Sequence, residues 1–309
     1  MNKPRRAPRR KVDGVLLLDK PLGMTSNAAL QKARWLFNAE KAGHTGTLDP
    51  LATGLLPLCF GEATKFAGEL LDADKTYLAT VKLGIVTDTA DAEGTVLATQ
   101  PVMVTEAELQ AVLPRFTGAI VQIPPMHSAL KRDGVPLYEL ARQGIEVERT
   151  PRTVTIRSLE LRAWRGDSFD LQVDCSKGTY VRTLAADIGS VLGCGAHLSA
   201  LRRTRVGAME VAQAVTLELL DALSPGERDR LLLTPDALLA DLPAVTLNEQ
   251  EAARMLHGQP VRWEGTPSHR CRLFGPQGFI GVGEFTADGW LQAKRLVATS
   301  PPPKALTTD

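Results

Sequence analysis

The spacing of hydrophobic and polar residues along the first sixty positions predicts two short strands around one helix. Val15–Leu18 is an uninterrupted apolar run, typical of a buried strand, and Asp19 with Lys20 and Pro21 ends it. Leu55–Phe60 is a second such run. Between them Thr25 or Ser26 caps a helix. Its inward face carries apolar residues at helical spacing: Leu30, Ala33, Leu36 and Phe37.

The middle of the chain mixes further strands and helices. The predicted strands are Leu78–Leu83 and the two alternating runs of Val154–Val173, which a turn at Arg165-Gly166-Asp167 joins into a hairpin; Asp91–Gly94 is a further turn. The predicted helices are Thr105–Phe116, opened by the capping box of Thr105 and Glu108, then Pro136–Gln143 and Tyr180–Leu192. Because these elements do not alternate regularly as β-α-β units, we predict an α+β fold with a mixed, largely antiparallel central sheet and flanking helices.

Changes in residue composition and pattern along the 309 residues predict four segments. Residues 1–11 form a basic disordered arm, 12–240 a large domain, 241–300 a small β-rich domain and 301–309 a tail. In the small domain Leu247–Leu256 predicts a helix, and three strand-like pieces follow it: Arg270–Phe274, Phe279–Phe285 and Trp290–Val297. Residues 241–300 carry six basic and six acidic side chains, so their charge gives no sign of RNA binding.

Charge is distributed unevenly. The formal net charge is +1, yet the first eleven residues hold six Lys or Arg and no acidic residue, which leaves −5 for the rest. Such an arm fits an anionic partner or a solubilising tail equally well. The apolar stretch after it is too short for a signal peptide, and no run reaches the 18 or so apolar residues of a membrane helix.

The four cysteines and five histidines are scattered, without the paired spacing of a zinc site. Each cysteine is most simply a small buried apolar residue. This pattern predicts a cytoplasmic protein without a metal.

Candidate chemistry is concentrated in residues 43–54, G-H-T-G-T-L-D-P-L-A-T-G. Its glycines permit positive φ and close approach to a ligand, and Pro50 keeps Asp49 out of the α region. The segment lacks the phosphate-binding pattern G-x-x-x-x-G-K-[ST]. A rigid loop that presents one carboxylate is typical of a catalytic loop, whereas a lone Asp-Pro pair is more often a turn.

Four segments in register decide between these interpretations: G-V-L-L-L-D-K-P-L-G-M-T at 14–25, the loop at 43–54, G-E-A-T-K-F-A-G-E-L-L-D-A-D-K-T-Y at 61–77 and G-T-Y-V-R-T at 178–183. Together they resemble the bacterial TruB-type tRNA pseudouridine synthases. The resemblance implies a pseudouridine synthase fold, a thumb-like insertion at about 124–153 and a PUA-like C-terminal domain. It also implies isomerisation of uridine 55 in the T loop of tRNA, without a cofactor, a membrane or an obligatory protein partner, by a monomer.

The resemblance also implies roles for single residues. Asp49 is the catalytic nucleophile, Arg182 pairs with it, and Tyr77 stacks on the target uracil and helps to remove the C5 proton. Tyr180 and Leu201 contact the flipped nucleoside, and His44 contacts RNA beside the loop. Lys20 supports the loop at the substrate-binding site. Three arginines, Arg202, Arg203 and Arg205, fit phosphate contacts or a solvated basic face equally well.

Two other functions compete with a self-contained tRNA synthase. One is an RNA-binding or RNA-folding protein that uses the same cleft without turnover; an isolated carboxylate facing a polyanion argues against it. The other is a guide-RNA-directed synthase, against which the thumb-like insertion and the compact chain argue.

Overall fold

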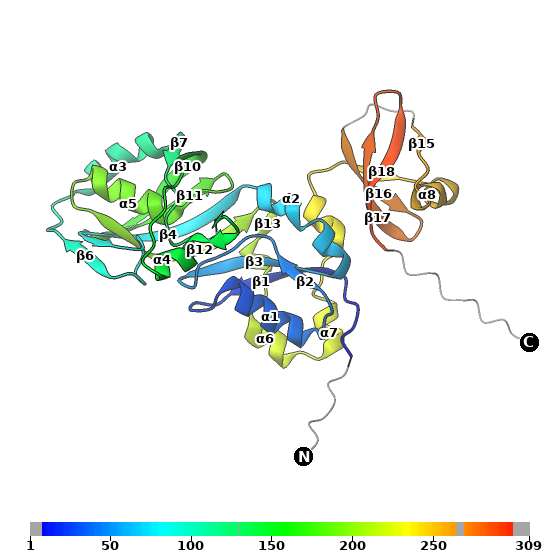
Figure 1. Ribbon diagram of the computed structural model, residues 1–309, viewed down its shortest axis with the longest axis horizontal. Helices are drawn as coiled ribbons and strands as arrows, with labels where there is room; N and C mark the ends of the chain where they lie inside the picture. The colour runs from blue at the N-terminus through cyan, green and yellow to red at the C-terminus, as the bar shows by residue number, and fades with distance from the viewer. Residues whose placement is uncertain (1–7, 129, 264–268, 299–309) are drawn as a thin grey trace, which may run out of the picture.

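The computed structural model describes residues 8–128, 130–263 and 269–298, and it has a large domain and a smaller β-rich domain at the C-terminal end (Figure 1). The large domain is built on a long sheet with helices on its flanks. The small domain is a five-stranded sheet with one helix. The predicted α+β class and the β-rich C-terminal domain are therefore confirmed.

The main sheet has nine strands within the described residues, in the order β1-β3-β12-β4-β11-β10-β7, with β2 beside β3 and β13 beside β12. Its strands are β1 (Gly14–Lys20), β2 (Ala42–His44), β3 (Ala52–Phe60), β4 (Lys75–Leu83), β7 (Gly118–Gln122), β10 (Arg152–Trp164), β11 (Ser168–Cys175), β12 (Ala196–Val206) and β13 (Met209–Glu210). All neighbours are antiparallel except β3 and β12. This parallel pair places the end of the candidate loop beside the middle of β12.

Short hairpins and helices complete the large domain. The hairpins are β5 (Ile85–Thr87) with β6 (Val96–Thr99), and β8 (Lys131–Arg132) with β9 (Val135–Pro136). The α-helices are α1 (Ser26–Leu36), α2 (Ala67–Asp72), α3 (Glu106–Val112), α4 (Leu137–Arg142), α5 (Val181–Val191), α6 (Leu217–Ala222) and α7 (Pro225–Asp229). The 3-10 helices are η1 (Gly61–Lys65), η2 (Leu113–Phe116), η3 (Val211–Gln213) and η4 (Pro235–Leu239).

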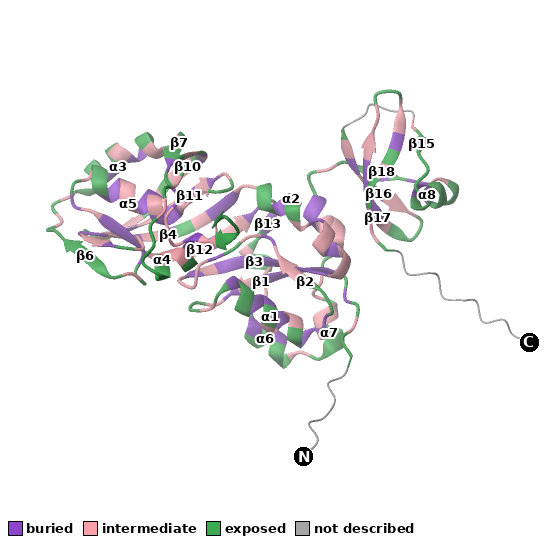
Figure 2. Ribbon diagram, viewed as in Figure 1, coloured by how far each residue is buried: buried purple, intermediate pink, exposed green. Residues whose placement is uncertain are grey.

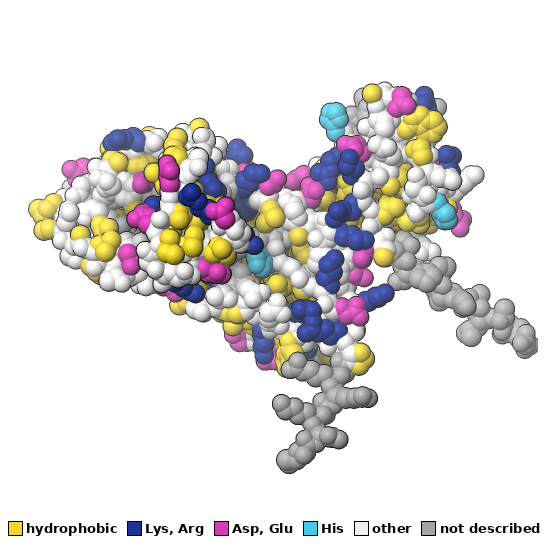
Figure 3. Space-filling view, viewed as in Figure 1, with side chains coloured by type: hydrophobic (Ala, Val, Ile, Leu, Met, Phe, Trp, Pro, Cys, Tyr) yellow, Lys and Arg dark blue, Asp and Glu magenta, His cyan; other side chains and the backbone are white. Residues whose placement is uncertain are grey.

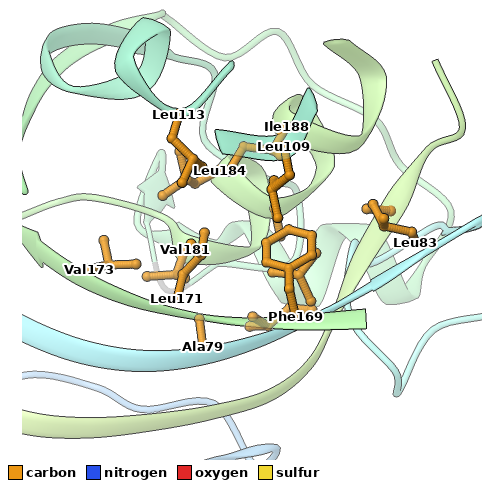
Figure 4. Packing of buried hydrophobic residues seen from close by; sticks show 14 of the residues in the cluster. Ala79, Leu83, Leu109, Leu113, Phe169, Leu171, Val173, Val181, Leu184 and Ile188 are labelled. Atoms are coloured by element: carbon orange, nitrogen blue, oxygen red, sulfur yellow. The ribbon is translucent and has the colours of Figure 1, made fainter. Parts of the chain in front are cut away.

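Apolar side chains from both layers form the core that holds α5 on the sheet. Figure 4 shows α5 and the α3–η2 segment packed over β4 and β11. Leu184 and Ile188 of α5 meet Leu171 and Phe169 of β11, and each of these four side chains is no more than 1% exposed. Their burial removes apolar surface from water and fixes the helix, whose first turn carries Arg182.

The C-terminal domain is joined to the large domain by a second apolar contact. Its strands are β14 (Ala244–Thr246), β15 (Val261–Arg262), β16 (Arg270–Gly275), β17 (Gly278–Phe285) and β18 (Trp290–Leu296), and its helix is α8 (Glu249–Leu256). Phe279 packs edge-on against Phe66, with ring centroids 5.6 Å apart. Arg270 forms an ion pair with Glu69 of α2 at 2.7 Å. Figure 2 shows buried positions continuing into this domain, so the contact is more than a covalent tether.

Two expectations need correction, and one strand was not predicted. Residues 43–54 are not one loop: Gly43 and His44 belong to β2, and β3 already begins at Ala52, so the loop is only 45–51. Strand β12 was not expected, because its polar residues hide the alternation of a strand. Pro136 precedes α4 as its N-cap and does not lie in its first turn.

The basic arm is only partly described. Residues 1–7 and the predicted tail at 301–309 lie outside the described residues. Arg10, in contrast, is held against the large domain: its guanidinium binds both carboxylate oxygens of Asp229 at 2.7 and 2.6 Å and donates to the Phe37 carbonyl at 2.9 Å. The basic segment is therefore anchored from Arg10 onward.

Candidate active site

The candidate catalytic loop, residues 45–51, is pinned to the start of α1. The Ser26 hydroxyl, only 2% exposed, accepts from the Leu48 N–H at 2.7 Å and donates to the Leu48 carbonyl at 3.0 Å. The Gly23 N–H donates to the carbonyl of Pro50 at 2.9 Å. These contacts fix the backbone on both sides of Asp49.

Lys20 holds the same region together from the end of β1. Its ammonium is fully buried and donates to the carbonyls of Pro21, Met24 and Pro50 at 3.0, 2.5 and 3.5 Å. Burial lowers the pKa of Lys20 to about 8, and the negative charge of Asp49 opposes that shift. Lys20 therefore reaches the loop through backbone carbonyls.

Asp49 is paired with Arg182. One Asp49 carboxylate oxygen lies 3.0 Å from Nη2 of Arg182. The Arg182 side chain is 7% exposed, whereas 42% of the Asp49 side chain remains accessible. The arginine is thus part of the wall, and the carboxylate is open to a ligand.

A second carboxylate fixes the other side of the guanidinium. Oδ2 of Asp91 lies 3.2 Å from Nη1 of Arg182, and the Asp91 side chain is 4% exposed. Arg182 also donates to the carbonyls of Thr89 at 3.1 Å and His127 at 2.6 Å. With four acceptors around it, the guanidinium has a single orientation towards Asp49.

Opposing influences act on the charge of Asp49. Burial raises the pKa of Asp49 above its ordinary value, and Arg182 opposes this rise. The charge of Asp91 adds to the increase, while Lys20 works against it. An ionised carboxylate in this position is desolvated on one side and charge-paired on the other, which is how nucleophilic carboxylates are prepared.

Asp49 and Arg182 line a pocket of about 240 Å³. That is below the roughly 300–1,000 Å³ of pockets that bury drug-sized ligands, and it suits one nucleoside rather than a helix of RNA. The other lining residues come from the loop, from α2, β3, β4 and β12, from α5 and the turn before it, and from the thumb-like segment. They include Leu48, Tyr77, Ser128, Tyr180, Leu201 and Arg203.

Tyr77 and Arg203 form the floor. Tyr77 on β4 lies directly opposite Arg203 on β12, so their side chains are on the same face of the sheet. Arg203 is 1% exposed and donates to the carbonyls of Leu55 at 2.8 Å and Gly46 at 3.3 Å. Burial raises the pKa of Tyr77, so its hydroxyl is protonated at neutral pH. Its ring lines the pocket and can stack on a base.

Tyr180 and Leu201 occupy two further walls. Tyr180 is the N-cap residue of α5, and its N–H donates to Oε1 of Gln122 at 3.0 Å. Leu201 lies in β12 opposite Ala52 of β3, so its backbone is beside the end of the loop. Gly54 permits this approach: a Cβ there would lie 2.3 Å from the Arg203 carbonyl oxygen.

Comparisons with known proteins agree on one family. Residues 34–181 match the family model described as TruB family pseudouridylate synthase (N terminal domain). Residues 182–240 match that of the tRNA pseudouridylate synthase B C-terminal domain, and 243–297 match pseudouridine synthase II TruB, C-terminal. The tRNA pseudouridine synthase B of an Azoarcus species is 61% identical over 295 residues, covering 96% of this chain and 98% of the relative. The chain belongs to the TruB family.

Further relatives support the assignment. The tRNA pseudouridine synthase B of Dechloromonas aromatica is 60% identical, over 93% of this chain and 96% of the relative. A chain in the crystal structure of a Cbf5-Nop10-Gar1 complex is 28% identical with a TM-score of 0.67, over 88% of this chain and 78% of that one. The predicted family is confirmed, and the protein is a pseudouridine synthase, an isomerase that acts on tRNA.

In this TruB-family enzyme the structure brings together five of the predicted residues: Asp49, Arg182, Tyr77, Tyr180 and Leu201 line one pocket. His44 is not among the lining residues. It ends β2, half-buried, and its Nδ1 accepts from the Gly46 N–H at 3.4 Å. Burial and the nearby Arg203 lower the pKa of His44, which favours the neutral ring at pH 7. Its contact with RNA stays a prediction.

Sequence reasoning missed two charged residues of this TruB-family site. Asp91 was expected only as the start of a turn, and it gave no signal because its partner, Arg182, is distant in the sequence. Arg203 was assigned to phosphates or to a solvated face. Its burial excludes the solvated face at this position, while Arg202 and Arg205 form ion pairs with Asp19 at 2.7 Å and Asp174 at 3.1 Å.

The cysteines, the possible metal ligands and the helices of this TruB-family chain bear on its other expected properties. Its cysteines are all buried and free. Within residues 8–128, 130–263 and 269–298 no group of three or more His, Cys, Asp or Glu is placed to hold a metal ion. In the same residues no helix has the length and apolar character to cross a bilayer.

Proposed function

We propose that this enzyme converts uridine 55 in the T loop of tRNA to pseudouridine, with Asp49 as the nucleophile and without a cofactor. The observation that carries the proposal is the Asp49–Arg182 pair in the wall of a nucleoside-sized pocket. The relatives in two other bacteria, both tRNA pseudouridine synthase B, support tRNA as the substrate.

The reaction breaks the N1–C1′ bond of uridine and forms a C5–C1′ bond, so nothing is oxidised and no group is gained. A carboxylate nucleophile divides this rearrangement into two easier steps. Asp49 forms the covalent adduct, at C6 of the base or C1′ of the ribose, and Arg182 orients it and stabilises its charge. Once the C5–C1′ bond has formed, the bond to Asp49 breaks, C5 loses its proton beside Tyr77, and N1 gains a proton.

The uridine must leave the folded T loop to enter the pocket. Enzymes that act on a base extrude it and hold it by stacking and by hydrogen bonds to its edge. Tyr77 provides the stacking surface, Tyr180 and Leu201 the walls, and Lys20 the rigidity of the loop. His44, at the margin of this region, contacts the RNA around the extruded nucleotide.

Charge on the surface agrees with a large polyanionic partner. Lys and Arg side chains gather over the junction of the two domains and down towards α7 in Figure 3. We infer that the T arm of tRNA is bound by a cytoplasmic monomer without a protein partner.

The test is to incubate the purified protein with an unmodified tRNA transcript and to map pseudouridine. We expect product at position 55, and none in a transcript with cytidine there. Tight tRNA binding without product would favour the alternative of an RNA-binding protein, and product only at other positions would disprove the specificity.

A further inference from the structure

Ser128, in the thumb-like segment at 124–153, has an unusual environment. It lines the same pocket as Asp49 and Arg182, and it is 4% exposed. Among the residues that the structure describes, its hydroxyl has no hydrogen-bond partner. A buried hydroxyl without a partner is destabilising, and most such groups in proteins are satisfied.

The backbone around Ser128 is held from three sides. Arg182 donates to the carbonyl of the preceding residue, His127, at 2.6 Å. The Ser128 N–H donates to the Met126 carbonyl at 2.9 Å, and the Ser128 carbonyl accepts from the Tyr138 N–H at 3.1 Å. One of these contacts comes from the arginine that pairs with Asp49, and another comes from α4. The serine is therefore fixed beside the pocket and cannot simply turn its backbone towards solvent.

Another serine of the same pocket differs in this respect. The Ser176 hydroxyl accepts from the Thr155 N–H at 2.9 Å and donates to the Lys177 carbonyl at 3.4 Å. The Ser176 hydroxyl therefore has both a donor and an acceptor within the protein and needs no ligand to satisfy it. At Ser128 the hydrogen-bonding capacity is unused, although the side chain is more buried.

We propose that Ser128 is a substrate-binding residue whose hydroxyl forms a hydrogen bond to the nucleoside extruded into the pocket. This inference rests on the proposed function. A hydroxyl both donates and accepts, and uridine offers carbonyl oxygens, an N–H and ribose hydroxyls. The thumb-like segment thereby contributes directly to the pocket, and Arg182 couples its position to that of Asp49.

The experiment compares Asp49→Asn with Asp49→Asn/Ser128→Ala, so that turnover does not disturb binding. We expect the Kd for a tRNA transcript to rise roughly 3- to 10-fold, the effect of one neutral hydrogen bond. The thermal midpoint should stay the same or rise, because an unsatisfied buried hydroxyl is removed. Ser199→Ala is the control: this hydroxyl donates to the Thr80 carbonyl at 3.1 Å, outside the pocket, and its removal should leave Kd unchanged.

An unchanged Kd would overturn the role of Ser128, as would a fall in the thermal midpoint that accompanies the weaker binding. A transcript with an abasic target nucleotide identifies the contacted group. The effect of Ser128→Ala disappears there if the hydroxyl binds the base and persists if it binds the ribose. Wild-type protein that binds tRNA without forming pseudouridine would overturn the proposed function alone.

Discussion

Asp49 must be reactive and yet remain ionised, and its neighbours divide this task. Desolvation and the charge of Asp91 raise its pKa, while Arg182 and Lys20 lower it. Arg182 forms an ion pair with both carboxylates: it lies 3.0 Å from Asp49 and 3.2 Å from Asp91. The planar guanidinium serves two acceptors in fixed directions, which a lysine ammonium cannot do.

Arg182→Lys should therefore keep the fold and most tRNA binding but reduce the single-turnover rate by about 100-fold or more, the effect of removing one preorganised charge from a reacting centre. The matched control is Arg165→Lys, which changes an exposed two-point pair with Asp170. Stopped or quenched assays at saturating tRNA measure the rate. A rate near that of the wild type for Arg182→Lys would disprove the pairing.

The pKa of Asp49 predicts a pH dependence. Only the carboxylate attacks, so the single-turnover rate should rise with pH and level off above the pKa of Asp49, which burial places above its ordinary value of 3.8. Asp91→Asn removes a charge that raises this pKa, so the rise of the rate with pH should occur at lower pH. Arg182→Gln removes a charge that lowers the pKa of Asp49, so any residual activity should rise at higher pH. A rate that rises over the same pH range in both variants as in the wild type would exclude Asp49 as the titrating group.

At the scale of elements, the thumb-like segment joins the pocket through a small interface. Leu137 is the one buried residue of α4, and α4 itself is six residues long. Replacing residues 128–148 with a short glycine-serine linker should therefore leave the unfolding transition nearly unchanged, because the segment adds little to the core. We expect weaker tRNA binding and slower turnover. Filter binding and pseudouridine mapping measure both, and turnover at the wild-type rate would contradict a role in RNA binding.

The sequence predicted those elements whose pattern is local. The capping box of Thr105 and Glu108 opens α3, and the turn at 165–167 joins β10 to β11. The order of strands was not predicted, because it depends on pairing between segments that are distant in the sequence, such as β12 with β3 and β4.

Strand β12 shows why some elements escape such reasoning. Arg202, Arg203 and Arg205 give the strand the composition of a solvated surface. Each has a partner distant in sequence: Asp19, backbone carbonyls, or Asp174. Burying an arginine costs much free energy unless its charge is paired and hydrogen-bonded, so these residues can be buried only once the fold has brought their partners to them. The same reason hid Asp91, whereas Asp49 and Arg182 were identified through the family motifs.

At the scale of the whole molecule, the described end of the N-terminal arm and the C-terminal domain both adjoin the large domain. Arg10 ties the arm to α7 through Asp229, and the Lys65 ammonium donates to the carbonyl of Leu296 at 2.9 Å. Figure 3 shows Lys and Arg side chains gathered over the junction of the two domains. A tRNA bound there would contact more than the pocket.

Removal of residues 2–7, which include three basic residues, should make tRNA binding less sensitive to salt. The slope of log K against log salt concentration should fall by about 0.7–0.9 for each phosphate that the arm neutralises, since fewer counterions are released. Keeping residues 8–11 preserves the Arg10 anchor, so the unfolding midpoint should not change. An unchanged slope would show that the arm is only a solubilising tail.

The central claim is that Asp49 is the nucleophile, and Asp49→Asn tests it most directly. The amide nearly matches the carboxylate in shape but is a poor nucleophile, so pseudouridine should become undetectable while tRNA affinity stays similar or increases slightly. The folded-state pKa of Asp49 is raised, so its contribution to stability is greatest at low pH and is lost as pH rises through that pKa. The variant should therefore be at least as stable as the wild type at neutral pH. Pseudouridine formation by purified Asp49→Asn at a rate measurable above background would contradict the account.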